Sequence, residues 1–81
     1  DHIMGVWEKS AEAYEDNANT CRSIADGLVA GIEFIADMSP HNQERIVRLH
    51  EEGEQYARAL ARIFTSMAAI HLSESEVEDD C

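Results

Sequence analysis

The chain has 81 residues, 44 % hydrophobic and 28 % charged, and its 17 acids against 6 basic residues give a net charge of −11 at pH 7. This length allows one domain and no more. Such an acidic chain is not expected to bind nucleic acid or an anionic membrane by neutralising phosphates, so we expect a protein partner, with a basic surface or an apolar groove as its natural complement.

We interpret residues 1–3 as a remnant of cloning and Met4 as the natural start, followed by one helical-hairpin domain over residues 4–72. Met4 is not followed by the basic stretch and apolar run of a secretory signal. The densest apolar segment, residues 28–36, is too short to cross a bilayer, which needs about 20 apolar residues. We therefore expect a cytoplasmic protein.

A first long helix is predicted over residues 6–36, because apolar residues recur there at alternating spacings of four and three. A repeat of seven residues stays on one side of a helix that packs along a partner helix. The mediocre helix formers at 17–20 leave a break into three helices as an alternative, although the repeat keeps its phase across them. The repeat consists of Trp7, Ala11, Tyr14, Ala18, Cys21, Ala25, Leu28, Ile32 and Ile35.

Small residues mark two faces of this helix. Ala11, Ala18 and Ala25 recur once per heptad, which either permits close approach of another helix or reflects the helix propensity of alanine. Gly27 and Gly31 each cost about 1 kcal/mol in helix propensity, so a close helix contact there would compensate.

A turn is predicted at Ser39 and Pro40, because serine suits an N-cap and proline suits the first position of a helix. The second helix is predicted over residues 40–72, antiparallel to the first because the connection is short. Residues 73–81 are acidic and are predicted to form a flexible tail. The second helix has its own heptad row, which consists of Ile46, Leu49, Gly53, Tyr56, Leu60, Ile63, Met67 and Ile70.

The apolar surface of both helices is wider than one seam, because further apolar residues flank the two rows. Exposed apolar surface of that extent usually marks an interface. We therefore predict an all-α antiparallel hairpin that pairs into a homodimeric four-helix bundle, with pairing to a different protein as the alternative. The flanking residues are Val29, Phe34, Val47, Ala57, Ala61, Phe64 and Ala68. The predicted seam of the core and the dimer comprises Tyr14, Ala18, Cys21, Ala25, Leu28, Ile32, Ile46, Leu49, Tyr56, Leu60, Ile63 and Ile70.

The two cysteines are predicted to be free thiols in a reducing compartment. Cys21 lies in the apolar row of the first helix, where a small buried thiol is an ordinary occupant. Cys81 follows the acidic tail and is expected to be exposed, with an intermolecular disulfide as an alternative.

No metal or cofactor site is predicted. Carboxylate metal sites in helical bundles use a Glu three residues before a His, and the residues three before His41, His50 and His71 are not acidic. Glu54 lies one turn after His50 but belongs to a charged face, where it pairs in sequence with Arg58. The serines have no evident base partner.

His50 follows Arg45 with four residues between them. This spacing resembles the Arg-to-His motif of HEPN-type ribonucleases, which are helical and often dimeric. The resemblance implies that His50 would act as general acid or base and that Arg45 would hold a phosphate. It covers six residues, and Ile46 stands where that family usually carries a polar residue.

The favoured hypothesis is a non-enzymatic regulator, inhibitor or dedicated chaperone that packs an apolar helix face against a protein partner. Its expected anchors are Trp7, Phe34, Phe64 and Met67, with the acids orienting the encounter. The alternative is an acidic mimic of nucleic acid that blocks a DNA- or RNA-binding protein. In that hypothesis the acids that stand in for phosphates are Glu8, Glu12, Glu15, Asp16, Asp26, Glu33 and Asp37.

Overall fold

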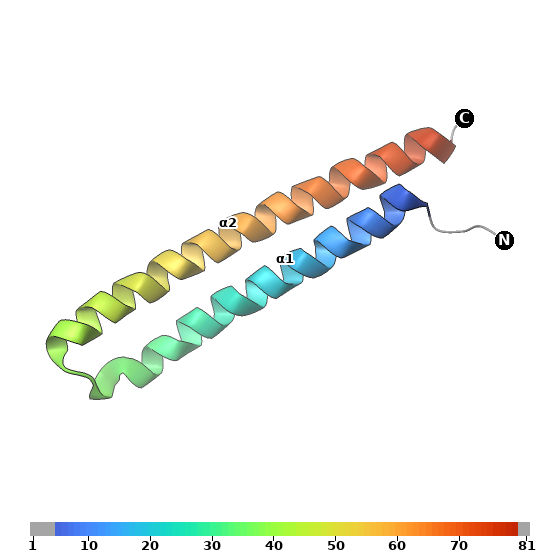
Figure 1. Cartoon of the computed structure of the whole chain (residues 1–81). Coiled ribbons are helices and arrows are strands. Elements are labelled where there is room, and N and C mark those ends of the chain that lie inside the picture. The colour runs from blue at the N-terminus through green and yellow to red at the C-terminus, as the bar shows by residue number, and fades with distance from the viewer. Residues whose placement is uncertain (1–4, 80–81) are drawn as a thin grey trace.

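The structure, a computed structural model, describes residues 5–79 and consists of two long helices joined by a tight turn. Helix α1 spans Val6–Gly31, the 3-10 helix η1 spans Ile32–Asp37 and helix α2 spans Pro40–Asp79. The two arms run side by side in opposite directions, so the start of α1 and the end of α2 lie together, away from the turn (Figure 1). The hairpin measures 63 × 20 × 11 Å. The predicted all-α hairpin is confirmed.

The first arm is one continuous helix and shows no break at residues 17–20. There the Thr20 hydroxyl donates a hydrogen bond to the backbone carbonyl of Asp16, 3.1 Å away, so this polar side chain is satisfied within the helix. The last five residues of the predicted helix, together with Asp37, form η1, whose tighter winding is common at the end of an α-helix. Ile35 in η1 is buried, which closes the apolar interior at the turn.

The connection between the arms is Met38 and Ser39, and Pro40 is the first residue of α2 as predicted. The Ser39 carbonyl accepts the Gln43 backbone N–H at 2.9 Å, and the Gln43 side-chain amide donates to the Met38 carbonyl. These bonds hold the turn against the first turn of α2.

Alanine rows from both helices form the centre of the hairpin. On α1, Ala11, Ala18 and Ala25 are at most 1 % exposed, and they lie where the heptad spacing predicts an inner face. On α2 the equivalent residues are Ala61 and Ala68, at 3 % and 2 %. The close-approach interpretation of the alanines therefore accounts for the packing, because a Cβ-only side chain lets two helix backbones come near each other.

The row that α2 buries within the hairpin lies one residue after the predicted heptad row. Ile46 and Met67 are half-buried, whereas the large side chains between and beyond them remain exposed. Both rows repeat every seven residues, so spacing alone could not choose between them. Against the alanine row of α1, a row that includes Ala61 and Ala68 packs closer than a row of large side chains. The predicted seam residues found exposed are Leu49, Tyr56, Leu60, Ile63 and Ile70.

Helix α2 continues past the predicted end at residue 72 and reaches Asp79. The prediction of a flexible tail is therefore corrected for residues 73–79, while residues 80 and 81, including Cys81, lie outside the described residues. Ser75 is 7 % exposed and donates a hydrogen bond to Glu8 Oε1 at 3.0 Å. The first turn of α1 thus gives this part of α2 a surface to pack on, which composition alone does not reveal.

Within residues 5–79, neither helix contains a stretch that is long and apolar enough to cross a membrane.

Candidate interaction surfaces

The contacts that arginine side chains make between the two helices lie on one side of the seam, here called the bridging side. Arg22 lies four residues after buried Ala18, Thr65 lies four residues after buried Ala61, and the Arg22 Nη2 donates to the Thr65 hydroxyl at 3.0 Å. Positions with the same offset from the two buried rows therefore share a side of this antiparallel pair. The ion pair of Arg58 with Asp26, at 3.1 Å, also spans the two helices.

The opposite side, here called the uncharged face, is formed by residues one before and two after each position in the heptad columns of the buried alanines, between Ser10 and Gly31 on α1 and between Ile46 and Ile70 on α2. A helix advances about 100° per residue, which turns these residues away from the bridging side. None of them is Asp, Glu, Lys or Arg, in a chain where those four make up 28 % of residues. On α1 the face consists of Ser10, Ala13, Asn17, Thr20, Ile24, Gly27 and Gly31. On α2 it consists of Ile46, Leu49, Gly53, Tyr56, Leu60, Ile63, Met67 and Ile70. Glu74, before buried Ser75, lies one turn beyond this face.

The α2 half and the α1 half of the uncharged face differ in the size of their side chains. The α2 half carries large side chains, of which Tyr56 is 74 % exposed and Ile63 54 %. The α1 half carries small side chains, with Ile24 as the only large one. At Gly27, no atom of α2 among the described residues lies within 4 Å of the position that a Cβ would take, so the contact predicted there is not made within this part of the hairpin. Gly31 does meet a neighbour, because a Cβ there would lie 3.0 Å from His50 Cε1.

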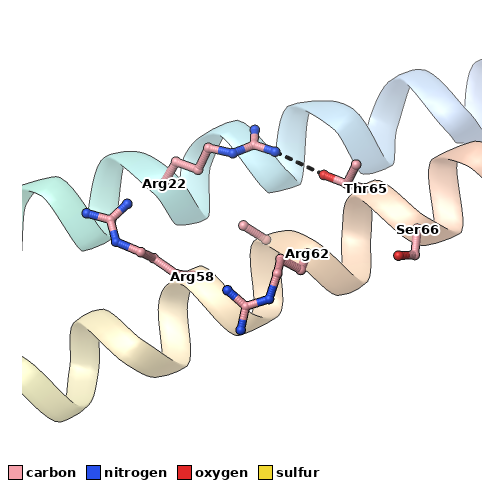
Figure 2. A pocket seen from close by; sticks show the side chains of 6 residues that line it. Arg22, Arg58, Arg62, Thr65 and Ser66 are labelled. Atoms are coloured by element: carbon pink, nitrogen blue, oxygen red, sulfur yellow. Dashed lines mark hydrogen bonds between the residues drawn. The ribbon is translucent and has the colours of Figure 1, made fainter.

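A groove on the bridging side gathers three of the chain's six basic residues (Figure 2). Arg22 reaches from α1 toward Thr65 on α2, while Arg58 and Arg62 extend from successive turns of α2. Among the described residues, Arg22 bonds to neutral groups: its Nη2 donates to Thr65, and its Nη1 donates to the Asn19 side-chain oxygen at 2.8 Å. The groove is lined by Arg22, Arg58, Ala61, Arg62, Thr65 and Ser66.

Arg58 is compensated within the hairpin. Its guanidinium donates to Glu54 at 2.9 Å and to Asp26 at 3.1 Å. The hydrogen bond to Glu54 and then the one to Asp26 raise the pKa of Arg58 above its ordinary value. Guanidinium groups suit carboxylates and phosphates, but the net charge of −11 opposes the approach of anions to this groove.

Aromatic rings fill the open end of the hairpin. The His71 ring lies edge-on to both Trp7 and Tyr14, with centroids 5.1 Å and 5.0 Å away, and Phe64 stacks on Tyr14 at 5.9 Å. The Nδ1 atom of His71 is buried and has no hydrogen-bond partner among the described residues. These rings therefore serve the contact between α1 and α2.

The four predicted anchor residues separate into two groups. Phe64 packs on the core of Ala18, Cys21 and Ala61, and Trp7 is half-buried against His71, so both are used within the hairpin. Both side chains contribute to the packing of the hairpin, and their role as partner anchors stays a prediction. Phe34 is 80 % exposed in η1. Met67 belongs to the uncharged face and is half-buried.

Arg45 and His50 do not converge. Five residues of helix place them about 140° apart around α2. Arg45 is exposed, whereas His50 is half-buried against α1, where its Nδ1 donates to the Leu28 carbonyl at 2.9 Å. No group of three or more His, Cys, Asp or Glu side chains within the described part of the chain could hold a metal ion. Cys21 is a free, buried thiol.

The predicted acid row of α1 lies away from the uncharged face. Asp26 pairs with Arg58, and Glu8 accepts from Ser75, so two of its members are engaged by α2. The side chain of Asp37 lies outside the described residues. The remaining members are exposed: Glu12, Glu15, Asp16 and Glu33.

Two of these features were missed from the sequence. The uncharged face could have been found as neighbouring heptad columns without a charged residue. The arginine groove could not, because Arg22 and Arg62 are distant in the chain and meet through the register of the two helices. Comparisons with protein-family models, curated proteins and solved structures give no match to this chain.

Proposed function

We propose that this chain is a protein–protein interaction module, a regulator, inhibitor or dedicated chaperone, that docks its uncharged face on an apolar helical surface. The observation that carries the proposal is the row of large apolar side chains on the α2 half of the uncharged face, which α1 does not cover. Leu49, Tyr56, Ile63 and Ile70 recur every seven residues and are all more than half exposed. A seven-residue repeat follows a straight seam only along another helix, so a helical partner suits this row.

Charge supports the same assignment. Between Ser10 and Gly31 and between Ile46 and Ile70, the acids lie on the bridging side and the outer surfaces, so the uncharged face itself carries no charge that would repel an apolar partner. Such a division is typical of an interface with an apolar centre and a charged rim. The acids would then influence orientation and association rate, and the apolar row would supply the affinity.

The acidic mimic of nucleic acid is the second candidate, and the exposure of Glu12, Glu15 and Asp16 on α1 and of Glu33 in η1 favours it. Binding through these carboxylates would fall by orders of magnitude between low and moderate salt, because each ion pair would be screened. Docking through the uncharged face would change little over the same range.

Photo-crosslinking in the cells from which the chain comes tests the proposal. The variant Tyr56→p-benzoylphenylalanine places the reactive group on the uncharged face, and Gln55→p-benzoylphenylalanine places it one residue away on the outer surface of α2. We expect covalent protein adducts at position 56 and few at position 55, identified by mass spectrometry. Equal yields at the two positions, or none at position 56, would contradict docking through this face.

A further inference from the structure

The uncharged face has a shape that fits its own copy. Its α2 half is a ridge of large side chains from Ile46 to Ile70, and its α1 half is a row of small ones from Ser10 to Gly31. At 1.5 Å per residue the two rows are about 36 Å and about 32 Å long, so they match in length. When a row of large side chains packs on a row of small ones, the two helices keep an even distance along their length, as in interiors where large and small side chains alternate.

The exposed area also fits a dimer. The chain exposes 6050 Å², whereas a compact monomer of 9.1 kDa exposes about 4,900 Å². A standard interface buries about 800 Å² on each partner, which would bring the exposed area of each chain closer to that of a compact monomer. Since neither half of the face carries charge, two copies bring no like charges into contact there.

We infer that the uncharged face binds a second copy of this chain, with α2 of each copy over α1 of the other and both turns at the same end of a four-helix bundle. In the other arrangement, α2 of one copy would pack on α2 of the other. Large side chains would then meet large ones, and small side chains would meet small ones. That arrangement forces the layers apart along one edge, and it places the two turns at opposite ends. This inference rests on the proposed function, because it names the partner of the same face.

The first test is the mass of the particle in solution. Light scattering at about 50 µM, where an affinity near 1 µM gives mostly dimer, is expected to give twice 9.1 kDa. Leu60→Asp is expected to give a helical monomer, with dimer affinity at least about 100-fold weaker, because a charge would be buried in the interface. Leu72→Asp is the matched control, since Leu72 on the bridging side is 41 % exposed and Leu60 is 44 % exposed.

A distance between the two turns tests the arrangement. A spin label at Ser39→Cys, in a Cys81→Ser background that keeps the buried Cys21, reports the separation of the two copies by pulsed electron resonance. Turns at the same end predict a distance comparable with the 20 Å width of the hairpin, and turns at opposite ends a distance near its 63 Å length. The longer distance would overturn the arrangement.

The outcomes separate this inference from the proposed function. A monomeric wild-type chain, or a dimer that survives Leu60→Asp and is lost with Leu72→Asp, overturns the inference. If the crosslinker at position 56 then captured only a different protein, the proposed interaction module would be retained, with that protein as its partner.

Discussion

Two histidines on the inner side of α2, His50 and His71, differ in whether their Nδ1 atom has a hydrogen-bond partner among the described residues. His50 is half-buried and donates to the Leu28 carbonyl at 2.9 Å, with its ring against Gly31. His71 is also half-buried, yet its Nδ1 atom is buried without a partner among the described residues. An unpaired buried polar atom costs about 1–3 kcal/mol, whereas a paired one contributes modestly to stability.

Replacing each histidine by phenylalanine should therefore give opposite results. His71→Phe keeps the edge-on contacts with Trp7 and Tyr14 and removes the unpaired nitrogen, so we expect about 1 kcal/mol of added stability. His50→Phe loses the bond to Leu28 and crowds Gly31, so we expect a loss of about 1–3 kcal/mol. Urea unfolding of both variants at one protein concentration measures the difference. Equal effects would show that the unpaired nitrogen carries no cost.

At the scale of the helices, the hairpin is organised by alanine on both sides of the seam. Ala11, Ala18 and Ala25 on α1 are buried as the heptad predicts, and Ala61 and Ala68 on α2 lie opposite them. The large side chain of Leu28 on α1 packs on α2 at a glycine: a Cβ at Gly53 would lie 2.9 Å from Leu28 Cδ1. The helices are close because the residues between them are small.

Enlarging one of these alanines should separate the helices. Ala18→Leu forces extra atoms into a site that is 1 % exposed, and we expect a loss of about 1–3 kcal/mol in the free energy of unfolding. Ala30→Leu on the outer surface of α1 makes the same chemical change where the side chain is exposed, and we expect at most about 0.5 kcal/mol. Chemical denaturation followed by circular dichroism measures both. Equal stability of the two variants would argue against close packing at Ala18.

For the whole molecule, charge and apolar surface are sorted onto different sides. The uncharged face contains the exposed row of large apolar side chains of α2, while the ion pairs of Arg58 with Glu54 and Asp26 lie toward the bridging side. Because these are surface pairs, they contribute little to the stability of the hairpin. The particle as a whole keeps a net charge of −11 per chain.

Salt should accordingly strengthen association of two copies. Two chains of charge −11 repel each other through solvent, and the screening length falls from about 30 Å at 0.01 M salt to about 8 Å at 0.15 M. We expect the dimer to bind about 10-fold more tightly at the higher salt, as measured by analytical ultracentrifugation. A dimer that dissociates as salt is raised would indicate that ion pairs, and not the uncharged face, hold it.

The amino-acid sequence was sufficient for the all-α hairpin, for the turn at Pro40 and for the inner row of α1, because heptad spacing and proline act locally. It could not choose between the row of Leu60 and the row of Ala61 on α2, since both have the same period. The packed hairpin selects the alanine row because the alanines of α1 allow close contact only with small side chains. The larger row is thereby left on the surface, and the same packing extends α2 past residue 72 along the first turn of α1.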